Sequence, residues 1–314
     1  MSPVRRPCCV PSKQRLAQVT ACARAAAARQ RATAGSLAGM VRLDGGPFHM
    51  GSEDPEAFPT DGEGPVRLVT LSPFHIASHA VTNEEFAEFV RRTGYRTEAE
   101  RFSWSFVFQN QVPQRERGSS MPGAPWWVRV DGADWSHPEG PDSAARPEIP
   151  AVHVRWSDAQ AYCGWSGYRL PTEAEWEFAA RGGLDRKTYP WGDDLTPGGR
   201  HMCNIWQGKF PDADLGEDGF TNVAPARSFP PNGFGLFNMV GNTWEWCADF
   251  FDPLWPVEDV STDPLGPPAG TARLMKGGSY LCHESYCRRY RNAARTGTDP
   301  GTSTGHIGFR VVRD

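Results

Sequence analysis

One segment of the sequence organises the interpretation of the rest: Gly277-Gly278-Ser279-Tyr280-Leu281-Cys282-His283-Glu284-Ser285-Tyr286-Cys287-Arg288-Arg289-Tyr290. It places two cysteines five positions apart among hydroxyl, imidazole and carboxyl groups. The glycine pair allows a sharp turn and a close approach by an extended peptide. Arg288, Arg289 and Arg291 put positive charge beside Cys287, which favours its thiolate. The cysteine spacing is too long for a thioredoxin-like C-x-x-C, and the chain has no C-x-x-C pair for a zinc ribbon.

Two thiolates without further ligands can form a soft-metal site, and soft thiolates select Cu(I). A structural disulfide and two unrelated thiols are the other interpretations of this spacing. The spacing alone leaves all three open.

Composition indicates a chain rich in turns with an aromatic core. Its 314 residues include 33 Gly, 28 Pro and 12 Trp. We predict one α+β domain with little regular secondary structure, spanning residues 41–314. Residues 1–41 carry seven basic and no acidic side chains, whereas 26 basic and 37 acidic side chains follow. Residues 1–40 are therefore predicted to be a disordered basic, alanine-rich arm.

Several classes of protein are disfavoured. No run of about 18 apolar residues is present, so no membrane span is expected. The arm lacks the continuous apolar region of a secretory signal. The eight cysteines are scattered, which is not typical of a small secreted domain held together by disulfides. We expect a cytoplasmic protein that is a monomer. The acidic body argues against nucleic-acid binding through Arg288-Arg289-Tyr290-Arg291.

Local patterns predict the elements around this segment. Thr82 and Glu85 form a capping box that begins a helix, and Gly94 ends it. Thr172 and Glu175 begin another, and Ser157 opens a third. Alternating apolar and polar residues predict strands at 41–50 and 66–76, with late strands at 274–276 and 309–312. Residues 103–150 and 189–235 are predicted to be loops.

The run from Lys276 to Cys287 resembles the active-site segment of formylglycine-generating enzymes, the sulfatase-modifying factors. The likeness continues to Gly308-Phe309-Arg310 and covers roughly residues 41–314. Two upstream motifs resemble the same fold: Arg169-Leu170-Pro171-Thr172-Glu173-Ala174-Glu175-Trp176-Glu177 and Gly241-Asn242-Thr243-Trp244-Glu245-Trp246. The resemblance implies a bacterial-type member with a fold related to C-type lectins.

The resemblance also implies an activity. Such enzymes oxidise the cysteine of a Cys-x-Pro-x-Arg motif in unfolded sulfatases to Cα-formylglycine, with O2 as oxidant and an external thiol as reductant. Cys282 and Cys287 would hold Cu(I) between them. The other implied catalytic residues are Ser279 and Tyr286 in an oxygen pocket, Trp244 as an aromatic wall, and His283 as a candidate for proton transfer.

Calcium sites are implied as well. The acidic loop around Asp212, Asp214, Glu217 and Asp218 could bind Ca²⁺ or simply be solvated. The resemblance implies two structural Ca²⁺ ions. Their ligands would be Asn204, Ile205, Asp218 and Phe220 at one site, and Asn238, Gly241, Thr243 and Glu245 at the other. Ile205, Phe220, Gly241 and Thr243 would contribute backbone carbonyls.

Recognition of the substrate is less defined. Trp126 and Trp127 could stack on a peptide or pack in the core. The positions that match the arginine-binding acids of secreted relatives hold Ala80 and Trp104, so other acids would have to serve. The positions that match the disulfides of those relatives lack one or both cysteines, which leaves Cys163 as a buried free thiol.

Two other functions compete with this interpretation. A non-catalytic C-type-lectin-like binding module would have the fold without the cysteine pair. A nonheme-iron sulfoxide synthase would need a helical domain that supplies histidines, which residues 1–40 cannot provide. The sequence therefore predicts a copper-dependent oxidase, with the binding module as the alternative.

Overall fold

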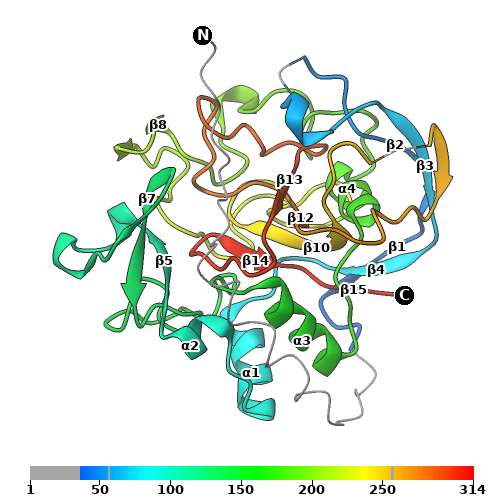
Figure 1. Ribbon diagram of the computed structural model, residues 1–314. Helices are drawn as coiled ribbons and strands as arrows, with labels where there is room; N and C mark the ends of the chain where they lie inside the picture. The colour runs from blue at the N-terminus through cyan, green and yellow to red at the C-terminus, as the bar shows by residue number, and fades with distance from the viewer. Residues whose placement is uncertain (1–35, 56, 256–257) are drawn as a thin grey trace.

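A four-stranded sheet lies at the centre of the fold (Figure 1). Its order is β13-β12-β10-β14, formed by Arg295–Thr298, Arg273–Lys276, Trp244–Phe250 and Ile307–Phe309. β10 pairs antiparallel with β12 and parallel with β14. Trp244 and Trp246 on β10 are fully buried. The computed structural model describes residues 36–55, 57–255 and 258–314, so the predicted arm lies, as far as residue 35, outside the described residues.

Smaller sheets surround the central one in the described part of the chain. One has the order β1-β4-β15 (Met40–Leu43, Phe74–Ala77, Val312–Arg313), and another β11-β3-β2 (Val260–Thr262, Arg67–Leu71, Gly46–Met50). Figure 1 shows a third sheet on the opposite side, β5-β7-β6 (Trp104–Phe108, Ala124–Asp131, Ser120–Met121). The hairpin β8-β9 pairs Gly208–Lys209 with Ala213–Asp214.

The helices begin and end where capping chemistry predicts. α1 (Asn83–Thr93) has the predicted Thr82–Glu85 capping box and ends at Gly94 in the left-handed conformation. α4 (Glu173–Arg181) has the predicted Thr172–Glu175 box. α3 (Trp156–Ser166) begins one residue earlier than predicted, capped by Arg155. The short helix α2 (Glu98–Phe102) was not predicted. Four short 3-10 turns complete the described set: Pro59–Asp61, Gln109–Gln111, Gln114–Glu116 and Pro197–Gly199.

The predicted strands are divided more finely in the structure. Residues 41–50 form two strands, because Gly45 and Gly46 have positive φ angles. Residues 66–76 and 309–312 are likewise each split between two strands. The prediction of a structureless segment at 103–150 was wrong. There, Val107, Val128 and Val130 belong to a small core of their own, which stabilises the β5-β7-β6 sheet.

Residues of the two fold motifs make polar contacts that join elements of the fold. Arg169 forms a forked ion pair with Glu175, at 2.6 and 2.7 Å, which fixes the start of α4. Glu245 on β10 accepts hydrogen bonds from Trp176 and Arg310, which ties α4 to the last part of the chain. These motif residues therefore hold the central sheet together rather than face a substrate.

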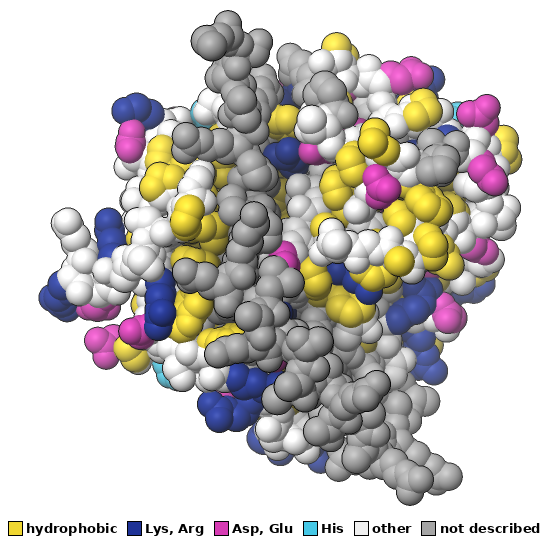
Figure 2. All heavy atoms as spheres, in the orientation of Figure 1, with side chains coloured by type: hydrophobic (Ala, Val, Ile, Leu, Met, Phe, Trp, Pro, Cys, Tyr) yellow, Lys and Arg dark blue, Asp and Glu magenta, His cyan; other side chains and the backbone are white. Residues whose placement is uncertain are grey.

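The described surface is mixed in character. Figure 2 shows hydrophobic side chains in several patches on one face, with acidic and basic side chains scattered between them. Leu254, Val260 and Leu265 are among the most exposed apolar side chains. Among the described residues, no helix combines the length and apolar character needed to cross a membrane.

Candidate active site

Cys282 and Cys287 lie in a tight turn that directs their sulfur atoms at each other. We call the segment that contains it, residues 277–290, the thiol turn. The Sγ atoms are 2.9 Å apart, and both side chains are buried. This separation exceeds the disulfide bond length of about 2.05 Å, so no disulfide joins the two cysteines. The backbone N–H groups of Tyr286 and Cys287 donate to the carbonyl of His283, at 3.0 and 2.7 Å. The turn therefore brings the two predicted metal ligands together.

The surroundings of the two sulfur atoms differ. Burial raises the pKa of the Cys282 thiol well above its ordinary value, and the neighbouring Cys287 raises it further. The Ser279 N–H donates to the Cys282 sulfur at 3.3 Å, which favours the thiolate. Arg289 Nη1 lies 3.8 Å from the Cys287 sulfur. The pair is thus a desolvated dithiol with one donor near each sulfur.

Arg289 and Arg291, two of the arginines that follow Cys287, each pair with a buried carboxylate. Arg289 pairs with buried Asp61, through Nε–Oδ2 and Nη2–Oδ1 contacts of 2.5 and 3.1 Å, and lies over the Phe58 ring. Arg291 forms a forked pair with buried Glu63, at 2.6 and 2.7 Å. These two pairs fasten the segment around residues 58–63 to the thiol turn. Sequence reasoning missed Asp61 and Glu63, because more than 200 residues separate each from its partner.

The glycine pair serves the protein's own packing. Gly277 and Gly278 are buried, with φ angles of +94° and +75°. A Cβ atom at Gly277 would lie 2.9 Å from the Met239 carbonyl, and one at Gly278 would lie 3.0 Å from the Arg289 carbonyl. These two glycines therefore allow a close approach between backbone segments within the chain.

Aromatic side chains flank the turn on one side. The Tyr286 ring stacks on Phe210 with a centroid distance of 4.4 Å, and Trp126 meets Tyr286 edge-on at 5.0 Å. Trp126 and Phe210 are half-buried. Trp127 is instead buried and stacks on His306 at 4.5 Å. The structure thus places Trp126, but not Trp127, where a peptide could reach it.

The remaining predicted catalytic residues are less tightly grouped. Ser279 is buried beside Cys282. Trp244 is buried in the same core cluster as both thiols. The His283 imidazole contacts Ser285 at 2.8 Å and lines a shallow pocket with Cys203, away from the sulfur–sulfur contact. Ser279 therefore contacts the pair directly, and Tyr286 directly precedes Cys287 in the chain.

Two oxygen atoms of the first implied calcium site, from Asp218 and Ile205, meet at one side-chain amide. The Asp218 carboxylate accepts from the N–H groups of Ile205 and Phe220, at 3.0 and 2.9 Å. Its Oδ2 and the Ile205 carbonyl also meet the side-chain amide of Gln207. Carboxylate and carbonyl oxygens suit a hard cation. The implied ligand Asn204 instead bonds Asn242 and the Asn222 carbonyl through its amide nitrogen.

The second implied site contains a polar atom that lacks a partner. Asn238 Oδ1 is buried without a hydrogen bond among the described residues, while its Nδ2 donates to the Pro225 carbonyl at 3.1 Å. An orphaned buried acceptor is costly, and a cation would satisfy it. The Glu245 carboxylate is bound to Arg310 and Trp176. Gly241 and Thr243 lie between these residues in the chain, so their carbonyls belong to the same loop.

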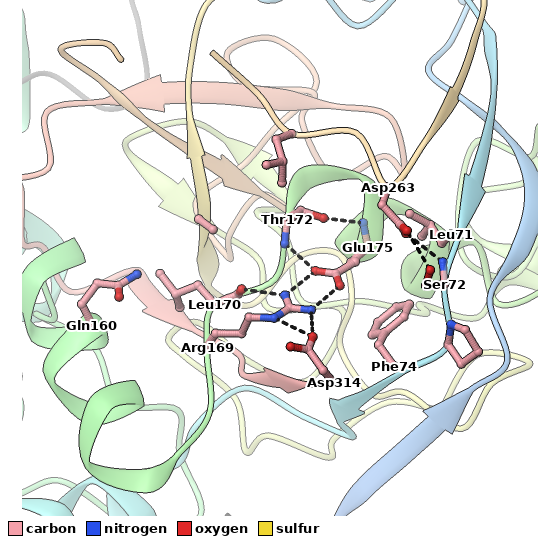
Figure 3. Close-up of a pocket in the computed structure, with 13 residues that line it drawn as sticks. Leu71, Ser72, Phe74, Gln160, Arg169, Leu170, Thr172, Glu175, Asp263 and Asp314 are labelled. Atoms are coloured by element: carbon pink, nitrogen blue, oxygen red, sulfur yellow. Dashed lines mark hydrogen bonds and ion pairs between the residues drawn. The ribbon is translucent and has the colours of Figure 1, made fainter. Parts of the chain in front are cut away.

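A cavity of about 400 Å³ lies beside the start of α4 (Figure 3). In Figure 3, the Arg169 guanidinium points at both Glu175 and Asp314, and Asp263 points at Ser72. None of the predicted site residues lines this cavity. Its charged side chains, Arg169, Glu175, Asp263 and Asp314, take part in contacts within the protein.

Comparison with known proteins shows the family of the chain. The family described as "Sulfatase-modifying factor enzyme 1-like domain" matches residues 25–314. The chain belongs to this family. Both the predicted family and the predicted α+β fold are thereby confirmed, although the match begins within the predicted arm.

Individual family relatives match most of the chain. The "Formylglycine-generating enzyme" of Thermomonospora curvata is 59% identical over 283 residues, covering 88% of this chain and 93% of that protein. A Bos taurus protein named "Inactive C-alpha-formylglycine-generating enzyme 2" is 45% identical over 286 residues, covering 88% and 89%. The solved structure of PvdO from Pseudomonas aeruginosa has a TM-score of 0.65 at 26% identity, covering 88% and 94%. Because the family includes a protein named as inactive, the site residues must carry the functional argument.

Proposed function

We propose that this protein converts the cysteine of a Cys-x-Pro-x-Arg motif in an unfolded sulfatase polypeptide to Cα-formylglycine. The observation that carries the proposal is the buried Cys282–Cys287 pair, with sulfur atoms 2.9 Å apart. The name of the Thermomonospora relative supports the same conversion. A binding module has no need of two desolvated, mutually facing thiols, since buried sulfur atoms do not take part in ligand display.

The overall reaction balances with an external thiol as reductant. The substrate thiol, O2 and two external thiol molecules give the aldehyde, hydrogen sulfide, water and one external disulfide. The substrate Cβ–S bond breaks, and O2 accepts electrons from the substrate carbon and from the external thiol. We place this chemistry in the cytoplasm in a monomeric protein; the free thiols Cys163, Cys203 and Cys247 support a reducing compartment.

Cu(I) fits the residues that would hold it. Cys282 and Cys287 provide two soft donors that face each other, which matches the preference of this ion. When bound, copper supplies one-electron chemistry with O2 that side chains lack. The Ser279 N–H and the Arg289 guanidinium each lie beside one sulfur, where they stabilise negative charge on the buried pair. The Tyr286 ring, which Trp126 meets edge-on, packs against the core cluster that contains both cysteines.

Two hard cations would stabilise the loops that contact the thiol turn. We propose Ca²⁺ at Asp218 with the Ile205 carbonyl, and at Asn238 with its loop. The Trp206 N–H, next to Ile205, donates to the Cys282 carbonyl at 3.1 Å. The Tyr280 N–H donates to the Asn242 carbonyl at 3.0 Å. Both loops therefore contact the thiol turn directly.

The test is conversion of a synthetic Cys-x-Pro-x-Arg peptide, followed by mass spectrometry in the presence of Cu(I), an external thiol and air. The expected product has the mass of an aldehyde in place of the thiol and reacts with hydroxylamine. Cys287→Ser should lose conversion while keeping its thermal stability within a few degrees, since the change is nearly isosteric. If the copper-loaded wild type binds the peptide but leaves its mass unchanged, the binding-module alternative replaces the proposal.

A further inference from the structure

Three aromatic rings from distant parts of the chain meet at Tyr286, the residue that directly precedes Cys287. The Phe210 and Tyr286 rings are nearly parallel, with centroids 4.4 Å apart and an interplanar angle of 9°. The Trp126 ring stands edge-on to both, at 5.2 Å from Phe210 and 5.0 Å from Tyr286. Stacked and edge-to-face pairs have preferred geometries, so each ring restricts the orientation of the others.

Phe210 is held independently of the thiol turn. It lies in the turn of the β8-β9 hairpin, where the Asn110 side chain donates to the Pro211 carbonyl at 3.2 Å. At the base of the hairpin, the Asp214 carboxylate accepts from the Gln207 and Gly216 N–H groups, at 3.1 and 3.2 Å. The buried Trp206 ring packs against Phe210 at 5.2 Å. The position of Phe210 is thus fixed before Tyr286 is considered.

The backbone conformation alone does not determine the orientation of the Tyr286 ring. Its N–H bonds the His283 carbonyl at 3.0 Å, which fixes the main chain of the turn. The side chain could still occupy more than one rotamer, because staggered χ1 wells are separated by modest energies. Tyr286 directly precedes Cys287, whose side chain is fully buried. The Tyr286 ring packs against the core cluster that contains both cysteines, so a rotation of the ring would change the packing around that buried sulfur.

We propose that Phe210 is a positioning residue for Tyr286. Its ring holds the Tyr286 ring beside Cys287, in the orientation that the reaction uses and that keeps the thiol from solvent. The role of the Tyr286 ring in catalysis rests on the proposed function. Phe210 contacts Tyr286. It therefore affects the reaction by orienting the Tyr286 ring and not by binding the peptide.

A double-mutant cycle tests this proposal with the full-length chain. The four proteins are wild type, Phe210→Leu, Tyr286→Leu and the double variant. The first measurement is the rate at which iodoacetamide alkylates Cys287 in the reduced protein, followed by peptide mass mapping. The second is kcat and KM for peptide conversion. Phe210→Tyr is the conservative rescue, and Phe234→Leu is the control, because the half-buried Phe234 ring stacks on Phe178 instead.

Coupled rings give non-additive effects. We expect each single variant to raise the alkylation rate of Cys287 about tenfold, and the double variant to exceed the larger single effect by less than about twofold. In Phe210→Leu, kcat should fall about tenfold with little change in KM. Phe210→Tyr and Phe234→Leu should behave as wild type in both measurements.

Other outcomes would overturn the proposal. Additive alkylation effects in the double variant would show that Phe210 does not act through Tyr286. A rise in KM with unchanged kcat would show that Phe210 contacts the peptide. If the wild type converts no peptide, the proposed function fails, whereas the alkylation cycle still decides whether Phe210 positions Tyr286.

Discussion

At the scale of single residues, Gly277 shows how the thiol turn depends on backbone conformation. Its φ of +94° is one that residues with a side chain rarely adopt, and a Cβ there would also meet Trp176 at 3.2 Å. Its carbonyl accepts the Gly241 N–H at 2.8 Å. The residue therefore joins the turn to the loop of the second implied calcium site at a point where no side chain fits.

Gly277→Ala should lower the free energy of unfolding by at least about 2 kcal/mol, because it combines left-handed strain with a backbone clash. Gly235→Ala is the matched control. Its φ is +79°, but nothing lies within 4 Å of its Cβ position, so only the conformational cost of about 1 kcal/mol should appear. Urea denaturation measures both variants. Equal losses would show that the close packing at Gly277 contributes nothing.

At the scale of secondary-structure elements, α4 and β12 are joined by a buried charge network. Lys276 Nζ lies 3.0 Å from Glu177 Oε2, and Arg181 Nη2 lies 2.7 Å from Glu177 Oε1. Burial alone would raise the pKa of Glu177, but Lys276 and Arg181 outweigh it and hold the pKa at about 2. Lys276 directly precedes Gly277, so this network anchors the strand that leads into the thiol turn.

Glu177→Gln should destabilise the protein by about 3–5 kcal/mol at pH 7, because it leaves the charge of Lys276 buried without its partner. The pKa of Glu177 is lower in the folded state than its ordinary 4.5. The stability it contributes is therefore complete above that ordinary value and is lost as the pH falls towards 2. The difference in the free energy of unfolding between wild type and Glu177→Gln should therefore shrink by about 3 kcal/mol over this pH range.

Urea denaturation at a series of pH values measures this difference. Glu88→Gln is the control, because Glu88 also pairs with two arginines but does so on the surface, and it should change stability little. A gap between wild type and Glu177→Gln that stays constant from pH 5 to pH 2 would contradict the account.

The elements also show what the sequence can and cannot predict. The boundaries of α1 and α4 followed from Thr82 and Thr172, because a capping box acts within four residues. The β5-β7-β6 sheet was missed, since its strands pair across a long irregular connection and are stabilised by contacts that no local pattern displays.

At the scale of the whole molecule, distant segments converge on the thiol turn. The loop that contains Ile205 and the loop that contains Asn242 bond to it and also to each other, through the Asn242 N–H and the Asn204 carbonyl at 2.8 Å. The cysteine pair was predictable because both residues lie in one short segment. Phe210, Asp61 and Glu63 were not, because their partners are far away in sequence and only the fold brings them together.

Removal of calcium should act on the whole molecule. If Ca²⁺ binds the native loops, a chelator should lower the melting temperature by several degrees, because an ion at about 100 times its dissociation constant contributes about 2.7 kcal/mol. Asn238→Ala should remove part of this response, whereas His79→Ala, outside both implied sites, should keep it. Differential scanning calorimetry with Ca²⁺, Mg²⁺ and chelator measures the effect. A melting temperature that is indifferent to chelation would remove both calcium sites from the account.

The central claim is that Cys282 and Cys287 act together as one soft-metal site. The most direct measurement is the copper content and X-ray absorption spectrum of the reduced protein after titration with Cu(I) against a competing chelator. We expect one Cu(I) ion per chain, with sulfur as its only nearest protein ligand. Cys282→Ser and Cys287→Ser should each lose that ion, while Cys203→Ser should keep it. Tight binding that survives either of the first two substitutions would contradict the claim.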